Sequence, residues 1–317
     1  MRLCHSRSHF SVPSSKVCMK SVEVFLVDAF TAEPGQGNRA GVVPGAWSLS
    51  TKEMQSIAAQ IGAPETAFFM KATSPGADIR LRWFSPSNEV SLCGHATVAG
   101  FFQLTGLGIL PFGKPLMVET KSGILTVRVE KDGDVVVPWF TLPTPKFRRA
   151  AGILRELEGP LGTQKMPLDA ELGPVRDDYL MYVPLKRFAD LSKISPEMDK
   201  LAEALERRKL GGVSVFTRAK SKDGDFRSRM FAPNIGIPED PVTGSANGPI
   251  GAYITLARLK KGRGKGGGTF KYMGAQGDLL GTPGRVRVRV KVEKGALTEV
   301  TVGGRAVLSS RRVIDLP

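Results

Sequence analysis

The chain has 317 residues, a hydrophobic content of 41% and a net charge of +15 at pH 7, which fits one large or two ordinary globular domains. No stretch approaches the roughly 20 continuous apolar residues of a membrane-spanning helix, so a membrane partner is not expected. The cysteines Cys4, Cys18 and Cys93 are few and scattered. They argue against a disulfide framework and favour a reducing compartment such as the cytoplasm.

The N-terminal segment has a composition of its own. Residues 1–22 carry basic and serine residues and no acid, and they lack the apolar run of a secretory signal. We assign residues 1–20 to a disordered or targeting tail. The protein is expected in the cytoplasm, with mitochondrial import left open.

Strand and helix patterns then follow in chain order. A helix is expected over 48–62, with a Ser50–Glu53 capping box and Gly62 as its terminator. A second helix is expected over 195–212, with Ser195 as N-cap and Pro196 in its first turn. Strands are expected at residues 22–30, 64–70, 77–84, 114–120, 123–137, 138–142, 212–218 and 226–233, with a loop over 31–41.

Basic residues are concentrated near the C-terminus. Between Arg258 and Lys294 there are eleven Lys and Arg against two acids, including the glycine-rich loop 260–268. Residues 285–292 alternate valine with a basic residue, which predicts a strand with a buried valine face and a solvated basic face. This pattern does not resemble a nucleic-acid-binding surface, because no aromatic side chains alternate with the Lys and Arg residues to stack on nucleobases.

Two segments of the sequence match each other. Residues 84–100 read FSPSNEVSLCGHATVAG, and residues 231–251 read FAPNIGIPEDPVTGSANGPIG. Aligning Gly94 with Gly244 places Glu89 on Glu239, Cys93 on Thr243 and His95 on Ser245, with a three-residue insertion after the second Phe-x-Pro start. We interpret the match as an ancient duplication. It divides the chain into halves 21–135, with which strand 300–315 could associate, and 136–299.

Each matching segment leads into an apolar helix. ATVAGFFQL (96–104) and PIGAYITLA (249–257) lack the polar stripe of a surface helix, so strands must wrap one helix inside each half. The N-terminus of each helix offers unpaired N–H groups and a partial positive charge. Two such ends at a cleft would bind a small anion such as a carboxylate through the backbone at Gly94, His95, Gly244 and Ser245. Gly94, Gly244 and Ala246 are small, which would let a ligand approach.

Three side chains are candidates for chemistry. His95 is the only histidine outside the N-terminal tail, and we expect no metal site because no His/Cys cluster is evident. Glu65, beside two phenylalanines, could take and return a proton if it faces the cleft. Asp240 could hydrogen-bond a substrate or stabilise the helix start, whereas the repeated Glu239 is interpreted as structural.

Ser245 and the glycine-rich stretches suggest two other chemistries, and the sequence disfavours both. The nucleophile elbow of serine hydrolases is G-x-S-x-G, and position 243 here is threonine. GRGKGGGT lacks the Gly-Lys-Ser/Thr ending of a phosphate loop, and TGSANG has no lysine. A Ser245–His95 hydrolase stays as a minor alternative.

Five motifs carry a resemblance that runs from about residue 21 to residue 310. In order they are VDAFTAEPGQGN, PETAFF, RWFSPSNEVSLCGHAT, RSRMFAPNIGIPEDPVTGSANGP and AQGDLLGTPGRVRV. They resemble the PhzF, or phenazine biosynthesis-like, family. The resemblance implies an α+β, diaminopimelate epimerase-like fold: two pseudo-symmetric domains, each a β-barrel-like sheet around a central apolar helix.

The resemblance also implies a cofactor-independent isomerase, typically a homodimer, that acts on a small carboxylic acid. Its proton-carrying glutamate matches Glu65, its histidine His95 and its aspartate Asp240. Related racemases use two cysteines at the repeat positions; here these are Cys93 and Thr243, so Cys93 is interpreted as a buried small residue. Asn247 occupies a variable position and could help to set substrate choice.

The expected function is isomerisation by one-base proton transfer through Glu65, in the cleft between the halves, with no cofactor and no metal. The first alternative is a non-catalytic binding protein that uses the cleft or the basic surface. The second is the serine hydrolase.

Overall fold

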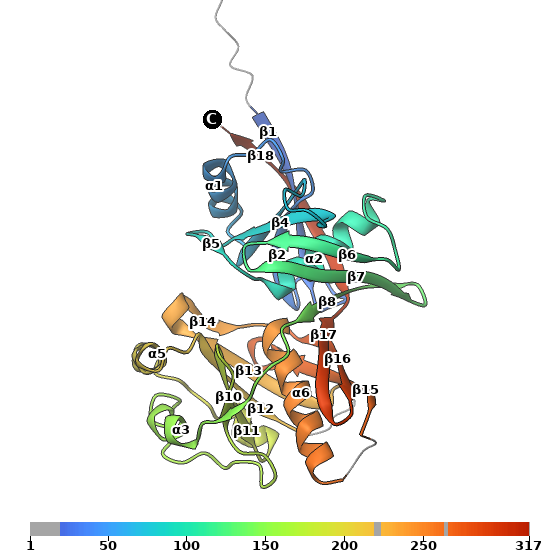
Figure 1. Ribbon diagram of the computed structural model, residues 1–317. Helices are drawn as coiled ribbons and strands as arrows, with labels where there is room; N and C mark the ends of the chain where they lie inside the picture. Colours follow the sequence, from blue (N-terminus) through green and yellow to red (C-terminus); the bar gives the residue numbers. More distant parts are fainter. Residues whose placement is uncertain (1–19, 219–222, 263–265, 317) are drawn as a thin grey trace, which may run out of the picture.

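The computed structural model describes residues 20–218, 223–262 and 266–316, in a mixed α/β fold. Within these residues, the strands join into one large mixed sheet accompanied by six α-helices. Two halves are stacked along the long axis of the molecule, with the N-terminal half uppermost in Figure 1. Residues 1–19 of the expected N-terminal tail and residues 263–265 of the glycine-rich loop lie outside the described residues, whereas Lys20, assigned to the tail, begins strand β1 and pairs with Leu316.

The N-terminal half begins and ends with the termini of the described chain. Its last strand, β18, pairs antiparallel with β1, so the end of the chain returns to the half in which it started (Figure 1). Its elements are β1 (Lys20–Ala29), β2 (Asn38–Val43), α1 (Thr51–Ile61), β3 (Glu65–Met70), β4 (Ile79–Phe84), β5 (Glu89–Val90), α2 (Gly94–Gly106), β6 (Pro115–Thr120), β7 (Gly123–Asp132), β8 (Val135–Leu142) and β18 (Ala306–Leu316).

The C-terminal half contains the intervening residues. Its elements are β9 (Arg148–Arg149), α3 (Ala151–Leu157), β10 (Val175–Arg176), β11 (Leu180–Leu185), α4 (Phe188–Ser192), α5 (Met198–Arg207), β12 (Gly212–Thr217), β13 (Phe226–Ala232), the short 3-10 helix η1 (Pro233–Ile235), β14 (Ile237–Asp240), α6 (Gly244–Lys260), β15 (Gly268–Gln276), η2 (Asp278–Leu280), β16 (Gly284–Glu293) and β17 (Ala296–Gly303).

The two halves have the same connectivity. In the first, β2–β3 and β4–β6 are parallel, and β3–β4, β6–β7 and β7–β8 are antiparallel. In the second, β11–β12 and β13–β15 are parallel, and β12–β13, β15–β16 and β16–β17 are antiparallel. The equivalent last strands, β8 and β17, pair with each other and join the halves. This order agrees with a duplication; the proposed boundary between residues 135 and 136 stays a prediction.

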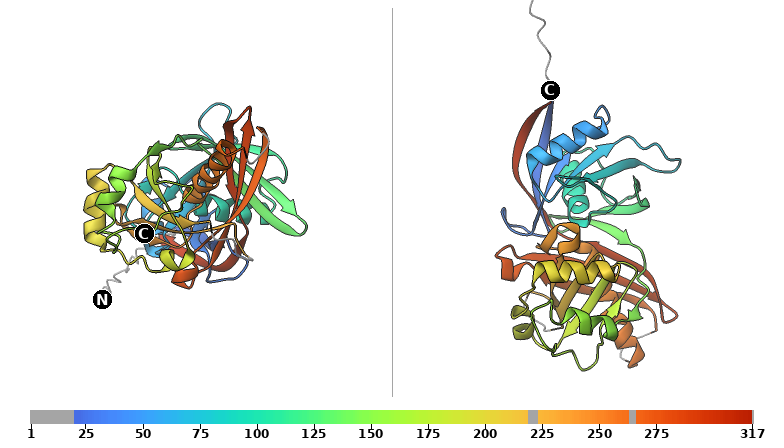
Figure 2. Two further views of the ribbon diagram at one scale, coloured as in Figure 1. Left: turned by 90° about the horizontal axis from the view of Figure 1, so that it is seen from below. Right: turned by 90° about the vertical axis from the view of Figure 1, so that its left-hand side faces the viewer.

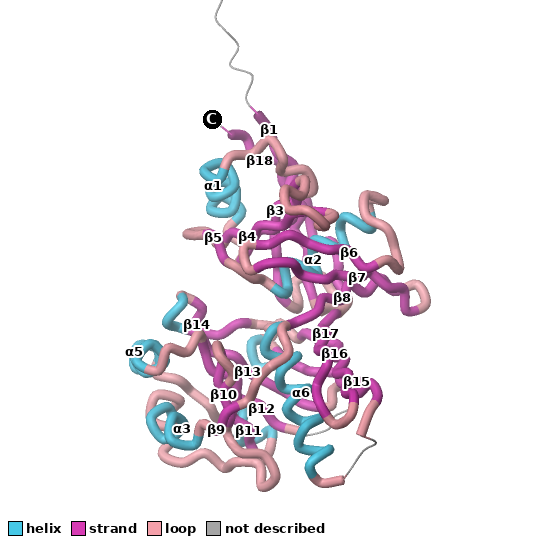
Figure 3. Tube along the Cα trace, viewed as in Figure 1, coloured by secondary structure: helices cyan, strands magenta, loops and turns pink. Residues whose placement is uncertain are grey.

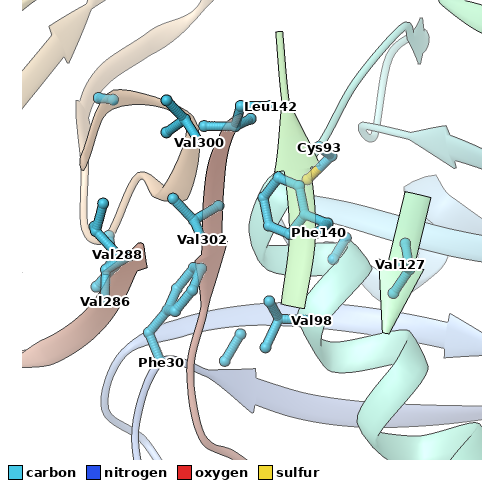
Figure 4. Close-up of a cluster of buried hydrophobic side chains, with 14 of the residues drawn as sticks. Phe30, Cys93, Val98, Val127, Phe140, Leu142, Val286, Val288, Val300 and Val302 are labelled. Carbon is cyan, nitrogen blue, oxygen red and sulfur yellow. The ribbon is translucent and has the colours of Figure 1, made fainter. Parts of the chain in front are cut away.

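The apolar helices α2 and α6 occupy the core, as the absence of a polar stripe predicts. α2 contacts strands β1, β2, β3, β7, β8 and β18, and α6 contacts β15, β16 and β17. Figures 2 and 3 show α2 among the strands of its half. The side chains around both helices form one buried cluster, which includes Phe30, Cys93 and Phe140 (Figure 4). Because the core is shared, both helix N-termini are fixed relative to each other.

The basic strand β16 has the predicted alternation of a buried valine face and a basic face that is exposed or partly exposed, and its basic residues are also ion-paired. Its valines 286, 288, 290 and 292 are buried. The bases on the other face are paired with acids: Arg285 with Asp278, Arg287 with Asp132, Arg289 with Glu130 and Lys291 with Glu293. Glu130 and Asp132 belong to β7, so two of these pairs join the two halves. An acid thus pairs with each of these four basic residues.

The helix signals were partly correct. The Ser50–Glu53 capping box is present, and Gly62 ends α1 with φ +67°. The expected N-cap Ser195 is wrong: α5 begins at Met198 after Glu197, whose N–H donates to the Pro160 carbonyl and holds the preceding residues against a loop. The loop expected over 31–41 is also too long, because β2 starts at Asn38. Of the helices that the structure describes, none has the length and apolarity to cross a membrane.

Candidate active site

A cleft of about 830 Å³ lies between the two halves. It is lined by both repeated segments, residues 85–95 and 235–245, and by Glu65. The segments reach the cleft because each follows a central strand and turns into the N-terminus of a core helix. The duplication has therefore placed two equivalent helix ends at one cavity, as the sequence predicts.

Glu65 is the first residue of β3, directly after the loop that ends α1. Parallel pairing of β3 with β2 fixes its backbone opposite Ala40. Its side chain is buried, and its Oε2 lies 3.2 Å from Nε2 of His95. The predicted proton carrier and the predicted histidine thus meet at the cleft.

His95 is the second residue of α2, and Cys93 is the helix N-cap. The Cys93 Sγ lies 3.5 Å from Nδ1 and 3.9 Å from Nε2 of the His95 ring. Burial, followed by the negative charge of Glu65, raises the pKa of the Cys93 thiol well above its ordinary value. Cys93 is buried, as expected, and a neutral thiol there is a weak nucleophile.

The expectation that no His/Cys cluster exists is wrong. Donor atoms of Glu65, Cys93 and His95 all lie within 4.8 Å of one another. Sequence spacing hid this set, because Glu65 comes from a strand 28 positions before the cysteine, and strand pairing rather than a local motif brings it to the helix end.

Asp240 ends β14 on the opposite wall of the cleft. Its Oδ1 accepts a hydrogen bond from Asn38 Nδ2 at 2.7 Å, and its Oδ2 accepts one from Thr243 Oγ1 at 2.5 Å. Both donors fix the carboxylate, and Asn38 also donates to the Val242 carbonyl. Asn38 comes from the other half, so Asp240 also ties the two walls together.

Sequence reasoning missed two positioning residues, Asn38 and Gln276. The buried Gln276 amide donates to the Asp240 carbonyl, and its oxygen accepts from Thr243 N–H at 3.1 Å. Both residues lie in quoted motifs, GQGN and AQGD, so the signal was available. The role of these two residues could not be predicted, because it depends on hydrogen bonds between residues more than 30 positions apart in the sequence.

The helix ends at Gly94–His95 and Gly244–Ser245 line the cleft. Within the part of the chain that the structure describes, no acceptor is seen for the backbone N–H groups of these four residues, as expected for a first helical turn. Core packing also requires these glycines, whereas ligand approach at them stays a prediction. A Cβ on Gly94 would lie 2.8 Å from Cζ of Phe140, and one on Gly244 would lie 2.9 Å from Cζ of Phe30. Ala246 is fully buried.

One ion pair recurs in both walls of the cleft. Arg82 on β4 holds Glu89 through two hydrogen bonds, and Arg229 on β13 holds Glu239 in the same way, at 2.8–2.9 Å. The Arg82 hydrogen bonds hold the pKa of Glu89 below its ordinary value. These pairs fasten each short strand to its neighbour, which agrees with the structural role expected for Glu239.

The geometry of the site does not support two other expected roles, those of Asn247 and Ser245. Asn247 is fully buried and donates to the Thr243 carbonyl and to Gln276, so it does not line the cleft and cannot contact a substrate there. Ser245 does line the cleft, but across the described residues no hydrogen bond joins it to His95, whose ring contacts Glu65 and Cys93 instead. A serine nucleophile would lack its base.

Comparison with known proteins shows the family to which the chain belongs. Residues 27–312 match the family described as phenazine biosynthesis-like protein. The chain belongs to the PhzC-PhzF family. It is 36% identical to uncharacterized isomerase YfhB of Bacillus subtilis over 94% of this chain and all of that protein. It is 38% identical to an uncharacterized isomerase of Deinococcus radiodurans, over 90% of this chain and 92% of that one.

Solved structures of PhzF proteins have the same fold. The Bacillus anthracis phenazine biosynthesis protein of the PhzF family matches with a TM-score of 0.81 and 29% identity, over 93% of this chain and 99% of that one. A hydroxyproline epimerase from Agrobacterium vitis matches with a TM-score of 0.56 and 15% identity, over 94% and 92% of the two chains. The second likeness concerns the fold alone. The relatives' names support an isomerase assignment for this chain.

Proposed function

We propose that this PhzF-family isomerase moves a proton between two carbons of a small carboxylic acid bound in the cleft, with Glu65 as the single base. The observation that carries the proposal is the buried Glu65–His95 pair at 3.2 Å, beside two helix N-termini. The diaminopimelate epimerase-like description of two pseudo-symmetric barrel-like halves belongs to the same proposal, because the cleft between the halves is its active site.

Substrate binding would use the helix ends. Free N–H groups of Gly94, His95, Gly244 and Ser245 and the two helix dipoles favour a carboxylate. The same groups stabilise the negative charge that develops when a neighbouring C–H bond breaks. Asp240, held by Asn38 and Thr243, would accept a hydrogen bond from a substrate amine or hydroxyl.

The proton transfer would proceed in two steps. The Glu65 carboxylate takes a proton from one carbon, and the electron pair of that C–H bond delocalises through the adjacent unsaturated system. Glu65, now a carboxylic acid, returns the proton to a second carbon of the same substrate while the double bond shifts. His95 holds Glu65 Oε2 in place. Racemisation at one carbon would need a second base, and Thr243 at the repeat position is not one.

The alternatives receive less support. The retained Glu65, His95 and Asp240 exceed what a binding protein needs, and the bases of β16 are already paired with acids. The Ser245 hydrolase lacks a contact between serine and histidine. A homodimer, a small-acid substrate, the absence of cofactor and metal, and location in the cytoplasm stay predictions.

The test is a screen of small unsaturated, amino and hydroxy carboxylic acids in deuterated water with chromatographic separation and mass detection. We expect at least one acid to give an isomer, and Glu65→Gln to give none. Ser245→Ala, which retains the backbone N–H, is the matched control and should retain activity. Full activity in Glu65→Gln would overturn the proposal, whereas loss only in Ser245→Ala, with hydrolysis products, would favour the hydrolase.

A further inference from the structure

The wall of the cleft formed by the C-terminal half carries exposed apolar side chains. Tyr179, directly before β11, is 56% exposed, and Ile235, in η1, is 49% exposed. Both line the cleft, together with Ile237 at the start of β14, and the proton transfer described above uses none of them. We call Tyr179, Ile235 and Ile237 the apolar rim. Apolar groups that gather in a concave site indicate a ligand-binding surface, unlike those scattered singly over a protein.

The Tyr179 side chain is held in place by its surroundings. Asp177 Oδ1 accepts hydrogen bonds from the backbone N–H groups of Tyr179 and Leu180, at 2.8 and 2.7 Å, which fixes the turn before β11. The Tyr179 ring lies against Gly211, where an added Cβ would be 2.1 Å from the ring carbon Cζ, so the glycine leaves room for the ring. A ring that is already fixed loses little conformational entropy when a ligand packs on it.

Tyr179 and Ile235 belong to the same part of the wall, because consecutive residues hold their backbones. The Gly211 N–H donates to the Tyr179 carbonyl at 2.8 Å. The carbonyl of Leu210, one residue earlier, accepts a hydrogen bond from Nδ2 of Asn234 at 2.9 Å, and Asn234 directly precedes Ile235. Apolar surface from two distant segments therefore comes together at one place on the cleft.

The other wall has a shorter and polar segment at the position of the two isoleucines. Between the Phe-x-Pro start and the repeated glutamate, the N-terminal half has only Ser87 and Asn88, whereas the C-terminal half has NIGIP, residues 234–238. The longer segment supplies Ile235 and Ile237. Because the equivalent framework forms in the other wall without such residues, the fold does not require two isoleucines here.

The apolar rim lies at a distance from Asp240, the acceptor proposed for the substrate. β14 runs from Ile237 to Asp240, and a strand rise of about 3.3 Å per residue separates their Cα atoms by about 10 Å. The cleft volume of about 830 Å³ is within the range of about 300–1,000 Å³ that is typical of pockets for drug-sized ligands. A substrate that contacts both Asp240 and the apolar rim must therefore extend along the whole of β14.

We propose that the apolar rim is the subsite for a bulky apolar group at the distal end of the substrate, so that the isomerised acid extends well beyond its reacting carbons. Its carboxylate lies at the helix ends, and its distal group packs on Tyr179 and Ile235 and is removed from water. The role of this acid as a substrate rests on the proposed function; the binding of its apolar group does not.

Binding is tested first, without reference to activity. Isothermal titration calorimetry of the full chain compares phenyl-terminated straight-chain acids of increasing length, from phenylacetate to phenylhexanoate. We expect the affinity to rise by about tenfold or more once the chain is long enough for the phenyl group to reach the apolar rim, because burial of an aromatic group contributes about that much. An affinity that does not rise along the series, or no binding of any member, would overturn the subsite.

Substitutions then locate the apolar contact. Tyr179→Ala and Ile235→Ser should each remove most of the gain for the longest acids and leave the affinity for phenylacetate unchanged, whereas Tyr179→Phe should retain the gain. Ile124→Ser is the matched control, because Ile124 is 48% exposed and lies on β7 outside the cleft. Circular dichroism confirms that each variant is folded. Equal losses in Ile235→Ser and Ile124→Ser would show unspecific binding and overturn the subsite.

A second copy of this chain is the alternative occupant of the apolar rim. Light scattering after size-exclusion chromatography measures the mass of the wild type and of the variant that carries both Tyr179→Ala and Ile235→Ser. We expect the same mass for both. A lower mass of the variant, together with unchanged affinity for the longest acids, would assign the apolar rim to a subunit interface and overturn the proposal.

Turnover is the last readout. Among the acids that the isomerase screen identifies, those with a distal apolar group should have the highest kcat/KM, and Tyr179→Ala should raise their KM by about tenfold with little change in kcat, as expected for loss of a contact away from the reacting atoms. An unchanged KM would overturn the role in substrate choice. Failure of the screen would remove this readout and leave the calorimetric result standing, so the two proposals fail separately.

Discussion

The two walls of the cleft have the same framework and different chemistry. The strand register shows which residues of the two walls are equivalent, because Phe84 and Phe231 begin the two repeated segments. Thr66 pairs with Phe84, and Val213 pairs with Phe231. Glu65, one residue before Thr66, therefore corresponds to Gly212. The aligned helix starts place His95 on Ser245 and Val90 on Asp240. The ion pairs Arg82–Glu89 and Arg229–Glu239, by contrast, occur in both walls.

This difference separates two kinds of residue. Groups that occur twice hold backbone: the glycines at each helix start, the arginine–glutamate pairs, and the first-turn bonds from Thr97 to the Cys93 carbonyl and from Asn247 to the Thr243 carbonyl. The candidate catalytic groups that occur in one wall only are the proposed base Glu65, the imidazole of His95 and the hydrogen-bond acceptor Asp240. In our account the repeated groups set stability, and the unrepeated groups set turnover. Four predictions test that division, in order of decreasing effect.

Asp240→Asn should lower kcat/KM by about 100-fold, because an amide in place of the carboxylate disturbs both the Asn38 and Thr243 hydrogen bonds and misplaces the substrate. Val90→Ala at the equivalent position of the other wall is the control, and it should cause a smaller loss. The measurement is steady-state kinetics with separate kcat and KM values. A similar loss of kcat/KM in the two variants would contradict a role of Asp240 in substrate binding.

Gly94→Ala should lower the free energy of unfolding by about 1–3 kcal/mol, because its Cβ would meet Phe140 at 2.8 Å in a filled core. Gly106→Ala, at the other end of α2, meets nothing within 4 Å and should stabilise the protein by about 0.5–1 kcal/mol. Urea unfolding of both variants is the measurement. Equal stability of the two would contradict the packing explanation for the glycine.

Glu89→Gln and Glu239→Gln should each destabilise the fold by about 1–3 kcal/mol, because each leaves a half-buried arginine with a weaker partner. Arg82 lowers the pKa of Glu89, so its contribution is complete above the ordinary pKa of about 4.3 and is lost as pH falls through the lower folded value. Unfolding at pH 7 and near pH 3 should therefore show a smaller difference between wild type and Glu89→Gln at the acid pH. A difference that grows in acid would reverse the assignment.

Alkylation of Cys93 should show the smallest effect. In a Cys4→Ser, Cys18→Ser chain, iodoacetamide at pH 8 should react with Cys93 more slowly than with free cysteine, because burial and the Glu65 charge raise its pKa. Glu65→Gln removes the second cause and should accelerate the reaction by up to about tenfold, the effect of one pKa unit. An unchanged rate in Glu65→Gln would show that Glu65 does not act on this thiol.

Much of this arrangement could be predicted from the sequence because local rules determine it. The Ser50–Glu53 capping box, the alternating valines of β16 and the two apolar helices each encode their own structure within a few residues. The repeat located both helix ends at one cleft. These features need no knowledge of distant contacts.

The remainder depends on contacts between distant segments. Nothing near Glu65 in the sequence indicates that it meets Cys93 and His95, and nothing near Arg287 or Arg289 indicates Asp132 and Glu130 as partners. The packing need for glycine at 94 and 244 is hidden in the sequence because Phe140 and Phe30 cannot be placed from sequence alone. Strand pairing and core packing decide these points.

The most direct test of a single proton carrier follows the label within one substrate molecule. An acid identified in the screen is prepared with deuterium at the carbon that loses its proton, and one turnover is run in ordinary water. If Glu65 alone takes and returns the proton, part of the product should carry deuterium at the new carbon, and Glu65→Gln should form no product. Complete loss of deuterium to water together with an undiminished rate in Glu65→Gln would contradict the account.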